Sequence, residues 1–203
     1  MPSDLSRRTF LRGSALTTAG ASMATTVTSS LSAQTAAAAN RNSTVGPEPA
    51  VLTLQINGTA RSVPVEPRAT LAEVLRGPLG LTGTKIACNR GACSACTIWL
   101  DGTPICSCMM LAVDVGARRI TTIEGLAQGG ALHPVQQAFI DHDALQCGFC
   151  TPGLVMSCAA LLDRNPEPNG DDVRAAISGH FCRCGTYPHV VAATLAAAKT
   201  QRG

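Results

Sequence analysis

The sequence predicts an α+β protein in which a small sheet domain precedes a helical domain. Two observations support this fold class. Apolar and polar residues alternate on both sides of Asn57-Gly58, a dipeptide typical of tight hairpin turns, whereas apolar residues recur at helical spacing after about residue 123. The length of 203 residues suits one or two small domains. We therefore expect a leader over 1–39, a linker over 40–49, a sheet domain over 50–122 and a helical domain over 123–203.

The leader has the pattern of a twin-arginine export signal. The run Ser6-Arg7-Arg8-Thr9-Phe10-Leu11-Arg12 precedes a weakly hydrophobic stretch of small residues with possible cleavage sites around 33–39. The alternative is a disordered basic leader. Because the twin-arginine route carries folded proteins with their cofactors in place, we expect a periplasmic protein whose ten cysteines are metal ligands more than disulfide partners.

Charge and hydropathy argue against a nucleic-acid-binding surface and against a membrane-spanning segment. The formal net charge is only +3, and the leader carries three arginines against one aspartate. The rest of the chain is therefore nearly neutral and predicts no basic face for nucleic acid. No run approaches the roughly 20 apolar residues that a membrane span requires. Gly46, Pro47 and Pro49 interrupt any regular element in the linker.

The elements expected in the sheet domain follow in order. Residues 52–65 predict a hairpin that turns at Asn57-Gly58, and Thr70 with Glu73 forms a capping box for a short helix that ends near Gly77-Pro78. Further strands are expected at 97–100, 105–108 and 120–123. A twisted sheet crossed by one helix is the β-grasp arrangement that ferredoxins use.

A loop before the third strand carries the first metal-binding motif. Cys88, Cys93 and Cys96 have the C-x4-C-x2-C spacing of plant-type ferredoxins, which indicates a 2Fe-2S cluster, and Cys108 on a later strand supplies the fourth thiolate. A zinc loop or a set of buried thiols is the alternative. Cys106 would point to the same face of a strand as Cys108, so spacing does not decide between them. We treat Cys106 as a small buried hydrophobe.

The helical domain is expected to hold helices at 133–142, 151–162 and 171–178, and one that starts at Pro188 with Val191, Leu195 and Ala198 on one face. Thr151 is the expected N-cap of the second helix, with Pro152 at its first position. Cys147 and Cys150 would then lie at a helix N-terminus, where the positive end of the dipole stabilises an anionic cluster.

Four cysteines in this domain form the second motif. A C-x2-C pair and a C-x-C pair lie on two loops at helix ends and predict a second metal centre in a small helical bundle, with the ligands Cys147, Cys150, Cys182 and Cys184. Zinc or a thioredoxin-type dithiol are the alternatives. Cys158 is expected to pack in the core. Trp99 and Tyr187 are expected to pack as well, and no ligand role is assigned to the histidines His133, His142, His180 and His189.

The two motifs together resemble the iron-sulfur subunit of the xanthine dehydrogenase and aldehyde oxidase family of molybdenum hydroxylases. Besides the cysteines, the resemblance includes Gly83-Thr84-Lys85, Ser107-Cys108, and the runs 146–153 and 182–187, and it spans nearly all of residues 50–190. It implies a plant-ferredoxin-like first domain and a four-helix-bundle second domain, each with a 2Fe-2S cluster. The family loop is often richer in glycine than this one, which has Ala87, Asn89, Ala92 and Ser94.

The resemblance also implies partners. The second cluster would lie beside a molybdopterin cofactor held by a large subunit, close to Gln146 and Cys184, and electrons would pass through the first cluster to an FAD-binding or a haem (cytochrome) subunit. With the leader, this suggests the small subunit of a periplasmic aldehyde oxidoreductase, with electron transfer as its role and no catalytic residue of its own. The rival interpretations are a free-standing ferredoxin and a zinc-stabilised interaction module.

Overall fold

The computed structural model describes residues 46–201. The twin-arginine pattern and most of the linker lie outside the described residues. Among the residues that are described, no helix combines the length and apolar character needed to cross a membrane.

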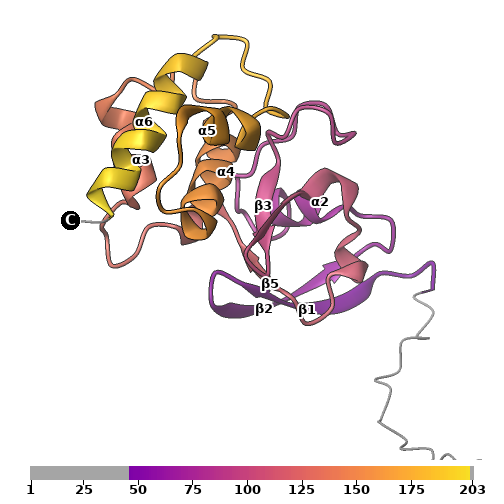
Figure 1. The fold of residues 1–203 in the computed structure, drawn as a ribbon. Helices are drawn as coiled ribbons and strands as arrows, with labels where there is room; N and C mark the ends of the chain where they lie inside the picture. Colours follow the sequence, from indigo (N-terminus) through magenta and orange to yellow (C-terminus); the bar gives the residue numbers. More distant parts are fainter. Residues whose placement is uncertain (1–45, 202–203) are drawn as a thin grey trace, which may run out of the picture. The chain divides into compact units, whose positions relative to one another are not determined.

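The N-terminal hairpin forms as expected. Strand β1 (Ala50–Ile56) pairs antiparallel with β2 (Thr59–Val65), so that Ile56 lies opposite Thr59 (Figure 1). Asn57 and Gly58 have φ values of 50° and 78°, the left-handed conformations that this two-residue turn requires. The apolar positions of both strands are buried at their second halves, which gives the hairpin one face toward the core.

A five-stranded sheet and one helix make up the N-terminal part. The strand order is β2-β1-β5-β3-β4, where β3 (Thr97–Leu100) and β4 (Thr103–Cys106) form the second hairpin and β5 (Arg119–Thr121) runs parallel to β1. Helix α2 (Leu71–Arg76) has the predicted capping box. Its buried leucines join the apolar face of the sheet in one core. The expected sheet with one crossing helix is confirmed.

Two predicted strand ends are wrong. The strand expected at 105–108 stops at Cys106, and Cys108 lies in a 3-10 helix, η1 (Ser107–Met109). The chain turns there because the hydroxyl and the backbone N–H of Ser107 both donate to the carbonyl of Cys96, at 2.7 and 3.3 Å. Strand β5 stops at Thr121, since the N–H of Thr122 donates to Oδ1 of Asn57 at 2.9 Å. Two further 3-10 helices are η2 (Ala112–Asp114) and η3 (Ile123–Gly125).

The C-terminal part of the described chain contains four α-helices, close to the predicted ranges: α3 (Pro134–Asp141), α4 (Thr151–Arg164), α5 (Gly170–Ala176) and α6 (Tyr187–Thr200). The N-cap of α4 is Cys150 instead of Thr151, and no side chain caps this helix. His133 caps α3, because its Nδ1 accepts the N–H of Val135 at 3.2 Å.

The buried face of α6 differs from the predicted stripe. Val191 and Leu195 are only half-buried, and Ala198 is the one predicted position that is fully covered. The face toward the protein consists of Val190, Ala193, Thr194, Ala197 and Ala198. Helix α3 packs directly on α6. Small side chains permit such a close approach of two helices, so alanines occupy the buried face of α6 and the larger Val191 and Leu195 lie at its margin.

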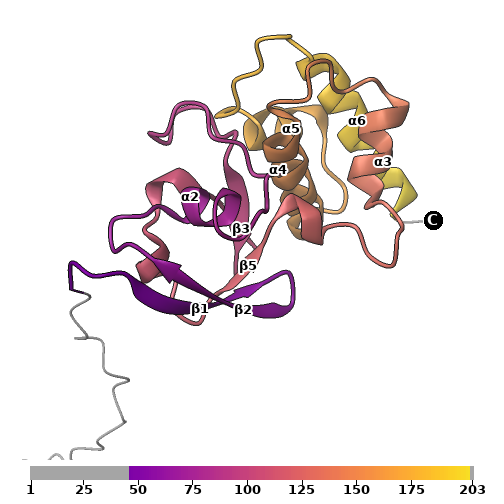
Figure 2. The ribbon, with the colours of Figure 1, turned by 180° about the vertical axis from the view of Figure 1, so that it is seen from behind.

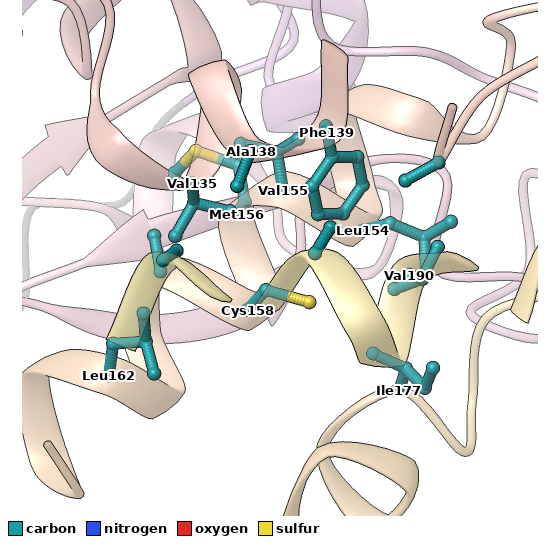
Figure 3. Close-up of a cluster of buried hydrophobic side chains, with 14 of the residues drawn as sticks. Val135, Ala138, Phe139, Leu154, Val155, Met156, Cys158, Leu162, Ile177 and Val190 are labelled. Carbon is teal, nitrogen blue, oxygen red and sulfur yellow. The ribbon is translucent and has the colours of Figure 1, made fainter. Parts of the chain in front are cut away.

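The core of the helical part surrounds α4. Figure 3 shows Leu154, Met156 and Cys158 of this helix packed together with Phe139 of α3 and Val190 of α6. Cys158 is fully buried, as expected. Burial raises the pKa of its thiol to about 12, against the opposing effect of a hydrogen bond with Thr194. Cys158 is therefore a packing residue that stays protonated.

Helix α4 also contacts the sheet. It lies beside β3 in both views (Figures 1 and 2). The indole N–H of Trp99 on β3 donates to the carbonyl of Met156 on α4 at 2.8 Å. Gly153 lies so close to the cysteine loop that a Cβ at this position would be 2.5 Å from the carbonyl oxygen of Ser94. Trp99 therefore joins the two parts by a hydrogen bond as well as by packing.

Candidate metal centres

The first candidate centre is the loop between α2 and β3. Its start is fixed by Arg76, whose guanidinium donates to the carbonyls of Thr82 and Thr84, both at 2.7 Å. The N–H of Gly83 donates to Oε1 of Glu124 at 2.8 Å. Gly83 has no room for a Cβ, which would be 2.3 Å from the side chain of Ile123. The loop is thus anchored before its first cysteine, at the Gly83-Thr84-Lys85 motif.

Backbone N–H groups point at two of the predicted ligands. Sγ of Cys88 accepts from the N–H groups of Arg90 and Ala92, at 3.4 and 3.3 Å, and Sγ of Cys108 accepts from Gly91 at 3.3 Å. The N–H of Arg90 is the main cause that lowers the pKa of the Cys88 thiol to about 7. N–H donors of this kind stabilise thiolates and tune the potential of a bound cluster. At Cys88 the loop therefore favours the deprotonated form that metal ligation requires.

Three loop residues have a left-handed backbone. Gly91 has φ of 70°, as suits a glycine, but Asn89 and Ser94 have φ of 49° and 54°. The serine costs roughly 1–2 kcal/mol more than a glycine would, whereas asparagine adopts this conformation more readily. Asn89 and Ser94 therefore hold a backbone conformation that favours glycine, in the loop that carries the candidate ligands.

Cys106 packs with the first thiol group, against Cys96 and Cys108, and is half-buried where full burial was expected. Its Sγ lies 3.8 Å from the hydroxyl of Ser94 and 4.0 Å from the carbonyl oxygen of Gly91. The neighbouring thiol of Cys96 lowers the pKa of the Cys106 thiol to about 6, and Cys106 in turn raises the pKa of Cys96. Burial raises the pKa of Cys108 to about 11. The first centre thus has five thiols, three in the loop and two after β3: Cys88, Cys93, Cys96, Cys106 and Cys108.

The second candidate centre lies where the loop before α4 meets the loop before α6. Cys147 and Cys150 lie in the first of these loops and Cys182 and Cys184 in the second, and the neighbouring thiols of Cys182 and Cys147 contribute to a raised pKa of Cys150. Burial is the main cause that raises the pKa of Cys150 to about 12. Burial would raise that of Cys182 too, but hydrogen bonds from Thr186 and others outweigh it and lower the pKa to about 7. Cys184 is half-buried two residues further along.

Two residues that support the second loop were missed from the sequence. The hydroxyl of Tyr187 accepts the N–H of Cys182 and donates to the carbonyl of His180, both at 2.8 Å. His180 is buried, with its Nε2 2.7 Å from the hydroxyl of Ser157, and burial lowers its pKa to about 4. Tyr187 follows the Cys182-Arg183-Cys184 run closely, and this proximity is the one sequence signal that could have revealed its role.

A backbone hydrogen bond connects the two centres. The N–H of Phe181 donates to the carbonyl of Cys93 at 3.3 Å. Cys93 is a predicted ligand of the first centre, and Phe181 directly precedes Cys182, a predicted ligand of the second. The two cysteine loops are thus in direct contact through their main chains.

The donors of the first centre suit a 2Fe-2S cluster, which takes four thiolates from the protein. Within the range 46–201, no group of three or more His, Cys, Asp or Glu side chains has the geometry of a single-ion site. The N–H groups of residues 90–92 donate to the Sγ atoms of Cys88 and Cys108, and such donors suit the thiolate ligands of a cluster. The cysteine loop of the first centre fits such a group.

Comparison with known proteins agrees with this geometry. Residues 54–122 match the family model described as a 2Fe-2S iron-sulfur cluster binding domain, and residues 122–195 match the one described as a [2Fe-2S] binding domain. The chain is 48% identical over 142 residues to the nicotine 6-hydroxylase small subunit of Paenarthrobacter nicotinovorans, covering 70% of this chain and 86% of that protein. This chain belongs to the family of 2Fe-2S subunits of molybdenum hydroxylases.

Other members of the family agree over more of the chain. The protein is 40% identical over 209 residues to the aldehyde oxidoreductase iron-sulfur-binding subunit PaoA of Escherichia coli K12, covering 95% of this chain and 88% of that one. The structure of quinoline 2-oxidoreductase from Pseudomonas putida 86 matches with a TM-score of 0.74 and 44% identity, over 76% of this chain and 97% of that chain. These homologues do not favour the free-standing ferredoxin or the zinc module.

Proposed function

We propose that this chain is the electron-transfer subunit of a molybdenum hydroxylase complex and holds two 2Fe-2S clusters. Cys88, Cys93, Cys96 and Cys108 would ligate the first, and the second would take the remaining predicted ligands, Cys147, Cys150, Cys182 and Cys184. A bound 2Fe-2S cluster accepts and releases single electrons. The observation that carries the proposal is the hydrogen bond from Phe181 to Cys93, because it connects the two groups of thiols by a short route of covalent and hydrogen bonds.

The second centre is the one that would face the molybdopterin subunit. Gln146 and Cys147 are exposed, and so are the aromatic side chains of Phe149 and Phe181, which lie in the two loops of this centre. Exposed apolar side chains around a redox site suit a docked partner better than a diffusible carrier. We propose that Gln146 and Cys184 lie next to the pterin there, and that the four helices α3–α6 act as the predicted four-helix bundle. The final acceptor would be an FAD-binding or a haem subunit.

Metal analysis and spectroscopy test the cluster assignment. The purified protein should contain about four irons and about four acid-labile sulfides per chain, and reduction should give two distinguishable EPR signals. Cys88→Ser should remove one signal and Cys147→Ser the other, since each deletes a ligand of one centre. Cys158→Ser, which changes a buried thiol outside both centres, should keep both signals. Zinc in place of iron, or the loss of both signals in each single variant, would contradict the proposal.

Export and assembly have their own tests. The arginine pair of the leader supports a periplasmic location, and Arg7→Lys with Arg8→Lys should leave the chain in the cytoplasm, as judged by cell fractionation.

Purification of the exported chain from its own cells should bring with it a molybdenum-containing chain. A chain that purifies alone with both clusters would be a free-standing carrier, which is the outcome that rejects its assignment to a larger complex.

A further inference from the structure

Thr122 and Glu124 lie where the sheet ends and the helical part begins, and together they contact two other segments of the chain. Thr122 follows β5 and is fully buried, whereas Glu124 is an exposed residue of η3. We propose that these two side chains are positioning residues of the first cluster, because they hold the start of its cysteine loop at Gly83. The inference rests on the proposed function, since it assumes that Cys88 and the other three predicted ligands bind that cluster.

The hydrogen bonds of this pair form a continuous series. The side-chain amide of Asn57 donates to Oγ1 of Thr122 at 3.0 Å, and its oxygen accepts the N–H of Thr122 at 2.9 Å. The Thr122 hydroxyl has one proton, which it donates to Oε2 of Glu124 at 2.5 Å. The other carboxylate oxygen, Oε1, accepts the N–H of Gly83 at 2.8 Å. These bonds therefore join the turn of the first hairpin to the cysteine loop through the residues that follow β5.

Two glycines let these segments approach closely. A Cβ at Gly83 would collide with the side chains of Ile123 and Glu124. A Cβ at Gly125 would collide with Oδ1 of Asn57. Neither glycine has a positive φ, so the close approach, and not the backbone conformation, requires the missing side chain. The cysteine loop therefore packs directly on η3 at its first residues and has little room to shift there.

Glu124 provides a contact that the other anchor of the loop cannot make. Arg76 of α2 donates to the carbonyls of Thr82 and Thr84. Because a guanidinium has no acceptor, Arg76 cannot bind the N–H of Gly83, which lies between those two residues. Glu124 supplies the acceptor from outside the loop. The main chain at the start of the loop is thus held by a cation from α2 and by an anion from η3.

The short helix η3 also belongs to the helical part. Ile123 packs against the core around α4, and Leu126 is a member of that core. Glu124 lies between these two apolar residues in sequence and binds the cysteine loop instead. A loop that is held through Glu124 is therefore held relative to the helical part, which carries the second centre. Loss of the carboxylate should let the first cluster shift while the second centre stays in place.

EPR and redox titration of the intact, cluster-containing protein test the proposal. Glu124→Ala removes the acceptor of the Gly83 N–H and of the Thr122 hydroxyl, so the first EPR signal and its potential should shift while those of the second cluster stay unchanged. The glutamate is exposed, and its removal leaves no cavity. Thr122→Val keeps the shape of the buried side chain without its hydroxyl and should shift the same signal. Glu124→Gln keeps an oxygen for the Gly83 N–H and should shift it less.

A matched control and a double variant accompany these changes. Glu66 is also an exposed carboxylate that accepts a hydrogen bond, from Arg68 at 3.0 Å, but it does not contact the cysteine loop through that bond. Glu66→Ala should therefore shift neither signal. Thr122→Val combined with Glu124→Ala should shift the first signal about as much as Glu124→Ala alone, because side chains in one hydrogen-bond network are not additive.

Two results would overturn the proposal. If Glu124→Ala and Thr122→Val both retain the first signal and potential of the unmodified protein, the pair does not position the loop, even if the melting temperature falls. If both variants shift the two clusters equally, the pair supports the fold as a whole and not the first centre. A failure of the proposed function itself looks different, because the unmodified protein would then lack the first signal from the start.

Discussion

At the scale of single residues, the cysteines are positioned by groups that the cysteine motifs do not contain. Tyr187 is the clearest case, since its hydroxyl holds the N–H of Cys182 and the carbonyl of His180 at once. Ser107 acts similarly on the carbonyl of Cys96 and thereby turns the chain toward Cys108. Each of these hydroxyls satisfies main-chain groups that flank a predicted ligand, so it fixes where the thiol can point.

Removing the Tyr187 hydroxyl should affect one centre only. In Tyr187→Phe the N–H of Cys182 loses its acceptor, and an unsatisfied group of this kind costs about 1–3 kcal/mol. We expect a lower melting temperature and an altered EPR signal of the second cluster, with the first signal unchanged. Thr53→Val, which removes an exposed hydrogen bond to Ser62, is the matched control and should change neither. An unaltered second signal in Tyr187→Phe would show that the hydroxyl does not position Cys182.

At the scale of elements, helix α4 serves both centres. Its N-terminus follows Cys150, its carbonyl at Met156 receives Trp99, and its Gly153 touches the main chain at Ser94. A sheet strand and a ligand loop are therefore built against one helix. A change in α4 should consequently be felt at the first centre, although the helix lies outside the sheet domain.

Gly153→Ala tests that coupling. The added Cβ would be 2.5 Å from the Ser94 carbonyl, so the helix or the cysteine loop must shift, at a cost of roughly 1–3 kcal/mol. We expect lower stability and a changed first EPR signal from a substitution in the helical part. In the control Gly170→Ala the nearest atom, at 3.3 Å, is the tip of the flexible Arg174 side chain, and no such change is expected. If the first EPR signal of Gly153→Ala is identical to that of the unmodified protein, α4 does not influence the cysteine loop.

At the scale of the whole described chain, apolar side chains at the surface indicate where a partner binds. Phe149 and Phe181 are 48% and 65% exposed, and both belong to the loops of the second centre. Val51 is 73% exposed but lies on β1, in the sheet. The two exposed phenylalanines in the loops of the second centre suggest a partner-binding surface more strongly than Val51 does, because partner contacts typically centre on aromatic anchors.

Phe181→Asp should therefore abolish assembly without harming the clusters. The side chain is exposed, and its backbone N–H, which bonds to Cys93, is retained in the variant. We expect both EPR signals to persist while the molybdenum-containing chain no longer co-purifies. Val51→Asp introduces the same charge at an equally exposed site and should co-purify as before. If both variants retain the partner, the second centre is not the docking face.

The sequence was most informative where a local rule decides the conformation. Asn57-Gly58 predicted the first hairpin, and Thr70 with Glu73 predicted the start of α2, because turns and caps depend on neighbouring residues. The end of β4 and the buried face of α6 were mispredicted, since each depends on contacts with distant segments. Spacing identified the candidate ligands but could not distinguish Cys106 from Cys108. In the structure the two sulfurs face different groups of Gly91, the N–H for Cys108 and the carbonyl for Cys106.

The contact between Gly153 and Ser94 also limits how such proteins can be recombined. The two family models meet at residue 122, which would look like a natural crossover for a chimaera of two relatives. A hybrid joined there would pack the cysteine loop of one relative against the α4 helix of another. Both the contact between Ser94 and Gly153 and the hydrogen bond from Trp99 to the Met156 carbonyl would then join segments from different proteins. Exchanging the modules intact therefore means transplanting those facing residues along with them.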